Sequence, residues 1–118
     1  MFQEDYLLSM IENMAKAVAR LAGAEAESDD DEADAAINDA GEALQAACGL
    51  GPDAMDSMPA QTLVSILTAS DRHLEERLDG VAFWLHAMAL RAQAAGNEDL
   101  ARTRWEKSQA IRAYQAGR

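Results

Sequence analysis

The segment Asp71–Tyr114 predicts two helices joined by a tight turn, and this pattern constrains the fold more than any other feature of the chain. Gly96 can adopt the left-handed backbone that ends a helix, and Asn97 is a favourable N-cap for the next one. In the first half, apolar residues recur at alternating steps of four and three, which places them on one helix face. They are Leu74, Leu78, Val81, Leu85, Met88 and Ala92. We therefore expect a helical hairpin.

Composition extends this prediction to the whole chain. The 118 residues include 26 alanines, which are the best helix formers, and only two prolines. This usage fits only the all-α class, and the length fits one domain spanning residues 1–118. We expect a small bundle of about five helices. The run Val81–Leu85 is apolar on every side, so the helix Asp71–Ala95 is expected to lie at the centre of the bundle.

The N-terminal segment 1–22 predicts an amphipathic helix. Five apolar residues repeat there at steps of four and three, as in the seam of a coiled coil or bundle. They are Leu7, Ile11, Met14, Val18 and Leu21. Such a stripe must be covered, because an uncovered one is an association site. We expect it to pack on the hairpin of its own chain or on a second chain, and we favour self-association, as in a homodimer.

The remaining segments follow from charge, glycine and proline. Residues 25–32 are expected to form an acidic linker, and residues 33–118 the helical core. The core begins with a helix over Ala33–Cys48, in which Gly41 either weakens the helix or permits a close crossing. Gly49–Pro52 predicts a stop, Asp53–Met58 a turn, and Pro59–Ala69 a short helix. We expect three side chains of this short helix to face inward: Leu63, Ile66 and Leu67.

The formal net charge of −11 argues against binding to nucleic acid or to an anionic membrane surface. Bases are concentrated near the C-terminus, as Arg102, Arg104, Lys107, Arg112 and Arg118. Our preferred interpretation is solvated helix faces matched to the helix dipole. The alternative is a contact between these bases and an acidic surface, on this chain or on another.

Location and redox state are predicted from absences in the sequence. The N-terminus has no basic region followed by an apolar run, so we expect no signal peptide. The longest apolar run, Val81–Leu90, is too short to span a bilayer. We expect a cytoplasmic protein that does not associate with membranes. Cys48 is the single cysteine and lies among apolar neighbours, which favours a buried, inert thiol.

Candidate sites for chemistry are few. His73 and Glu76 have the spacing of a helix-borne metal pair, but a solvated helix start is the preferred interpretation. The run Asp29–Glu32 lacks the alternating ligands and the glycine of a calcium loop. His86 is expected to be a packed histidine, and both tryptophans, Trp84 and Trp105, are expected in the core. We predict no catalytic residue, no cofactor and no metal site, and therefore no enzyme.

The opening residues support a first resemblance. Met1–Glu12 combines Phe2, Asp5 and Tyr6 with an Ile-Glu step, and Ala17–Leu21 follows. This segment resembles the start of a family of short helical bacterial proteins that share an N-terminal Met-Phe-x-x-Asp-Tyr signature. No activity is established for that family, so the resemblance implies a helical fold and no particular chemistry.

The hairpin supports a second resemblance. Ala89, the Gly96-Asn97 turn, Ala101 and Trp105 fall at the offsets of the small, turn and aromatic positions of a tetratricopeptide repeat. The segment Asp71–Tyr114 is similar to the helical hairpin of that repeat. The resemblance implies a scaffold that binds proteins.

These observations predict a non-enzymatic module that binds a protein, a peptide or a second copy of itself, through the N-terminal helix or a groove beside the hairpin. One alternative is a metal-binding or minor enzymatic bundle, which would need at least three buried carboxylate or histidine side chains together. Another is an acidic regulatory protein that binds a basic partner through Glu25–Asp56.

Overall fold

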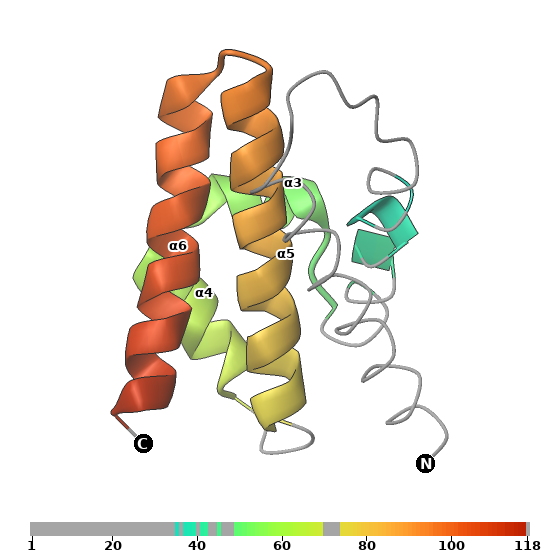
Figure 1. Cartoon of the computed structure of the whole chain (residues 1–118). Helices are drawn as coiled ribbons and strands as arrows, with labels where there is room; N and C mark the ends of the chain where they lie inside the picture. The colour runs from blue at the N-terminus through green and yellow to red at the C-terminus, as the bar shows by residue number, and fades with distance from the viewer. Residues whose placement is uncertain are drawn as a thin grey trace.

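The computed structural model describes residues 35, 37–39, 41, 42, 45, 49–69 and 74–117. These residues form helices and turns, with no strand among them, so the predicted all-α bundle is confirmed (Figure 1). The helices with complete bounds are α3 (Pro52–Ser57), α4 (Ala60–Leu67), α5 (Leu74–Ala94) and α6 (Glu98–Ala116). The described residues between 35 and 45 are also helical, as predicted. The N-terminal stripe and the linker 25–32 lie outside the described residues.

The predicted hairpin is formed by α5 and α6, which stand side by side in Figure 1. Gly96 adopts the left-handed conformation with φ of +84°. Its N–H donates to the carbonyl of Gln93, and that of Asn97 donates to the carbonyl of Ala92, which satisfies the last carbonyls of α5. The side chain of Asn97 accepts a hydrogen bond from the N–H of Leu100 and caps α6. The turn therefore has the chemistry that its two residues predict.

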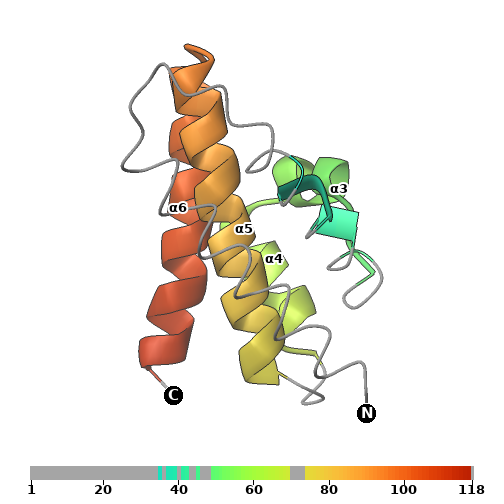
Figure 2. The same ribbon diagram turned by 45° about the vertical axis from the view of Figure 1, so that its right-hand side comes forward.

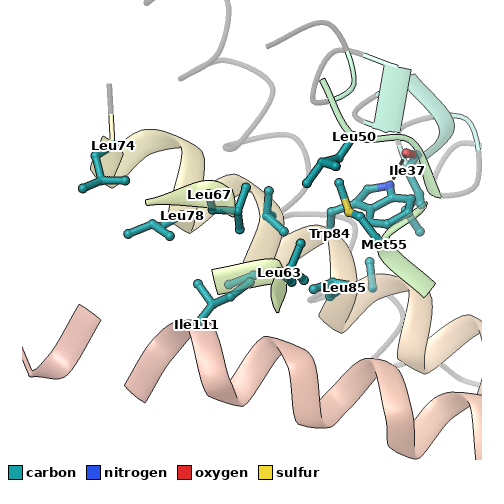
Figure 3. Close-up of a cluster of buried hydrophobic side chains, with 13 residues drawn as sticks. Ile37, Leu50, Met55, Leu63, Leu67, Leu74, Leu78, Trp84, Leu85 and Ile111 are labelled. Atoms are coloured by element: carbon teal, nitrogen blue, oxygen red, sulfur yellow. Dashed lines mark hydrogen bonds between the residues drawn. The ribbon is translucent and has the colours of Figure 1, made fainter. Parts of the chain in front are cut away.

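The core lies between the hairpin and the helices α3 and α4. These two helices pass behind the hairpin in Figure 1 and lie to the right of α5 in Figure 2. The predicted stripe of α5 is buried except for Met88, which is half-buried. This stripe packs with side chains from the other elements, including Ile37, Met55, Leu63, Leu67 and Ile111 (Figure 3). α5 contributes more buried residues than any other described helix, as its apolar run predicts, whereas α4 packs mainly against α6.

Gly41 permits a close crossing, the second of the two roles that its position allowed. A Cβ atom at residue 41 would lie 3.0 Å from Nε1 of Trp84. The indole therefore approaches a glycine, and its Nε1 donates a hydrogen bond of 3.1 Å to the carbonyl of Ile37 (Figure 3). Trp84 is buried, as expected, and connects α5 to the helical residues between 35 and 45.

Two predictions for the segment that follows are wrong. The residues expected to turn, Asp53–Met58, instead lie largely in the short helix α3, which places Met55 in the core. The α4 side chain Ile66 was expected inward but is 40% exposed, because the buried face of α4 is formed by Leu63 and Leu67. The stop at Gly49 is confirmed, since this residue has φ of +77° and its N–H donates to the carbonyl of Gln45.

Candidate functional site

An open groove of about 580 Å³ lies between α5 and α6, near the turn of the hairpin. Ala89 from α5 and Ala101 from α6 have small side chains, which leaves space between the two helices. Larger and polar side chains complete the lining: His86, Leu90, Gln93, Glu98, Arg102 and Trp105. The groove therefore combines apolar surface with a polar edge, which is the composition of many ligand sites.

An aromatic pair closes the end of the groove that lies away from the turn. The rings of His86 and Trp105 are 4.8 Å apart between centroids, with an interplanar angle of 64°. Trp105 was expected in the core, but it is 43% exposed, so that expectation is wrong. His86 is half-buried and packed on a neighbouring ring, as expected. The indole of Trp105 thus offers an apolar face to solvent beside the groove.

The surroundings of His86 favour the neutral form of its imidazole. Burial of the imidazole lowers the pKa of His86, and the positive charge of Arg112 lowers it further. Arg112 itself lies over the ring of Phe83, 4.7 Å from the centroid, and donates a 2.6 Å hydrogen bond to Asp79. At the aromatic end of the groove, the surroundings therefore favour an uncharged imidazole.

The two charged side chains of the groove differ in their pairing. Arg102 donates to Asp99 at 2.7 Å, so its charge is matched by a neighbour on the same helix. Glu98 is exposed and has no ion pair with any residue that the structure describes. The unmatched charge of the groove is therefore a single carboxylate, at the end next to the turn.

A buried polar cluster fixes the position of α6 against α3 and α5. Arg104 forms a two-point pair with the carboxylate of Asp56, at 3.1 and 2.7 Å, and also donates to the carbonyl of Met88. Lys107 is only 4% exposed, and its Nζ donates to the carbonyls of Met55 and Asp56 at 2.7 and 2.9 Å. These contacts involve the helix that carries Trp105, so they hold the floor of the groove in place.

The cluster also corrects the interpretation of the C-terminal bases. Arg104 pairs with Asp56 and Arg112 pairs with Asp79, while Lys107 binds main-chain carbonyls, so these three are not solvated matches to the helix dipole. None of them lies in the last turn of α6. The alternative, a contact with acidic groups of the same chain, is the one that the geometry supports. For Arg102 the preferred interpretation holds, because its side chain is exposed to solvent.

Within the described part of the chain, no group of three histidine, cysteine or acidic side chains could hold a metal ion. Every buried side-chain nitrogen or oxygen in that part has a hydrogen-bond partner. None of the described helices is long and apolar enough to cross a membrane. What the groove can do is bind a ligand that has both apolar and charged groups.

The predicted interaction residues Leu7, Ile11, Met14, Val18 and Leu21 lie outside the described residues, as do Cys48, His73 and the run Asp29–Glu32. The sequence predicted a groove beside the hairpin but did not indicate which residues line it. Its signal was the pair of small residues, Ala89 and Ala101, at the same offsets from Gly96-Asn97 that support the repeat resemblance.

Comparison of the chain with models of protein families, with curated proteins and with solved structures found no match. The two resemblances drawn from the sequence therefore stay predictions.

Proposed function

We propose that this protein is a non-enzymatic interaction module that binds a protein or peptide segment in the groove between α5 and α6. The observation that carries the proposal is the 43% exposure of Trp105 beside the groove. Tryptophan is the residue type most enriched among the side chains that dominate binding energy at interfaces. The floor of Ala89 and Ala101 leaves room for an incoming side chain next to the indole.

The rigidity of the surroundings supports the same proposal. The groove lies between two long helices rather than on loops, and the contacts of Arg104 and Lys107 fix one of these helices against α3. A preformed site loses less conformational freedom on binding than a flexible one. The proposed partner is a protein or peptide. The test also covers the case in which this protein is a second copy of the chain.

The test is selection of binders from a displayed library of random peptides, using the full chain. Peptides that bind the wild type but not Trp105→Ala are selected for study. The matched control is Tyr114→Ala. Tyr114 is also an exposed aromatic residue of α6, but it does not line the groove. We expect groove binders to tolerate the control variant.

The two indole N–H resonances then locate the contact by nuclear magnetic resonance. Trp84 donates its N–H inside the core, whereas Trp105 borders the groove. Binders should shift the resonance of Trp105 and leave that of Trp84 unchanged. Light scattering of the free chain at rising concentration reports whether a second copy is the partner. A library that yields no binder sensitive to Trp105, together with a monomeric chain, would refute the proposal.

A further inference from the structure

The charge and spacing within the groove specify which kind of segment it takes. We propose that the groove selects an extended peptide in which an apolar side chain lies against Trp105 and a basic side chain, three residues away, pairs with Glu98. This inference rests on the proposed function, because it names the chemistry of the partner for the same groove.

The apolar requirement comes from the end of the groove beside the aromatic pair. Trp105 is 43% exposed there, and its ring meets that of His86 at 4.8 Å between centroids. Ala89 and Ala101 provide a floor of methyl groups next to it. An uncharged imidazole, an indole and two methyl groups favour an aliphatic or aromatic side chain over a charged one.

The basic requirement comes from the other end. Glu98 is exposed and unpaired among the described residues, whereas Arg102 is already matched by Asp99 at 2.7 Å. The chain as a whole carries a formal charge of −11, so its field attracts cationic segments and repels anionic ones. A lysine or arginine near Glu98 is therefore favoured locally and by the molecule as a whole.

The spacing follows from helix geometry. Glu98 and Trp105 are seven residues apart on α6, which at a rise of about 1.5 Å per residue separates them by about 10 Å along the axis. An extended peptide in the polyproline II conformation has three residues per turn and rises about 3.1 Å per residue. Residues three positions apart therefore lie on one face and are separated by about 9 Å, close to the distance between Glu98 and Trp105. In a peptide with adjacent basic and apolar residues, the two side chains point to different faces of the peptide, so they do not both face the groove.

The probes are synthetic peptides of glycine and serine that contain one leucine and one variable residue three positions away, in either order. The variable residue is lysine, glutamate or glutamine, and a further peptide places lysine next to leucine. Binding to the full chain is measured at low ionic strength from the shift of the Trp105 indole resonance, up to millimolar peptide. Of the two lysine peptides, we take the one whose order of lysine and leucine gives the tighter binding. We expect it to bind about fivefold or more tightly than the glutamate peptide of the same order, because glutamate replaces an attraction to Glu98 by a repulsion.

Two charge reversals separate the local pair from the general field. Glu98→Lys and Glu106→Lys change the net charge equally, and both residues are exposed on α6, but only Glu98 lines the groove. Glu98→Lys should invert the preference, so that the glutamate peptide binds better. Glu106→Lys should retain the preference for lysine. High salt should weaken the preference in the wild type, since it screens exposed charges.

Several results would overturn the inference: equal binding of the three peptides, equal binding of the adjacent and spaced lysine peptides, equal effects of the two charge reversals, or no shift with any peptide at millimolar concentration. The proposed function fails separately. If peptides selected from the library bind at Trp105 but show no need for a basic residue, the groove is a binding site and only its specificity has been misassigned.

Discussion

Replacing Gly41 with alanine tests the crossing between α5 and the helical residues before it. At an exposed helix position this change stabilises a protein by about 1 kcal/mol, because alanine is the better helix former. Here a Cβ atom would lie 3.0 Å from Nε1 and 3.3 Å from Cε2 of Trp84. The indole is 3% exposed and held by its hydrogen bond to Ile37, so it has little freedom to withdraw.

The expected sign is therefore opposite to the propensity rule. Forcing an extra methyl group into a packed contact costs about 1–3 kcal/mol. Taking about 2 kcal/mol for the contact and subtracting about 1 kcal/mol for the gain in propensity leaves a net destabilisation of about 1 kcal/mol. The free energy of unfolding should fall by that amount.

A double-mutant cycle isolates the cause. Trp84→Phe removes the indole nitrogen and the outer ring atoms that the new methyl group would meet. In that background Gly41→Ala should stabilise by about 1 kcal/mol, giving a coupling of about 2 kcal/mol between the two positions. The four proteins are compared by denaturant unfolding followed by far-ultraviolet circular dichroism. Equal effects of Gly41→Ala in both backgrounds would refute the crossing.

Four further predictions concern the charged and titratable groups. Arg104→Met should lower the free energy of unfolding by about 2 kcal/mol, because it leaves Asp56 unpaired in a half-buried position. Arg102→Met should change it by less than about 0.5 kcal/mol in the same denaturant assay, since that pair is exposed. Burial lowers the pKa of Lys107, so the unfolded chain binds the proton more tightly than the folded one. The wild type should therefore gain stability relative to Lys107→Met as pH rises from that lowered pKa towards 10.5, and a difference that is constant with pH would contradict this. The imidazole of His86 should titrate below pH 6.5 by nuclear magnetic resonance, and Arg112→Gln should raise its pKa only in part, because burial is the larger cause of the shift. An unchanged pKa in Arg112→Gln would show that the charge of Arg112 does not reach the imidazole.

The hairpin could be predicted from the sequence because its determinants are local. The apolar period of α5 and the Gly96-Asn97 turn each occupy a short window, and both predictions are confirmed. The short helix α3 could not be predicted in this way. Its six residues are too few to show a helical period, and its stabilising partner is Lys107 of α6, far away along the chain. Such a contact leaves no local signal.

The groove was partly predictable. The small residues Ala89 and Ala101 follow from their offsets to the turn, but the exposure of Trp105 does not. Trp84 and Trp105 are both surrounded by helical sequence, and composition alone favours the core for each. The difference in burial between the two tryptophans depends on which face of each helix packs against another element. Trp84 faces Gly41, whereas Trp105 projects beside the groove.

The hydrogen bonds from Lys107 to the carbonyls of α3 lead us to expect a particular order of folding. An isolated helix of six residues is unstable in water, and the carbonyls that Lys107 binds lie 52 and 51 residues before it. The hairpin of α5 and α6 is built from neighbouring residues and closes a shorter loop, so we expect it to form first. Only then is the ammonium group in place to hold α3. For the same reason we expect α3 to be the first of the four helices with complete bounds to open, because the end of a side chain from another helix holds its backbone.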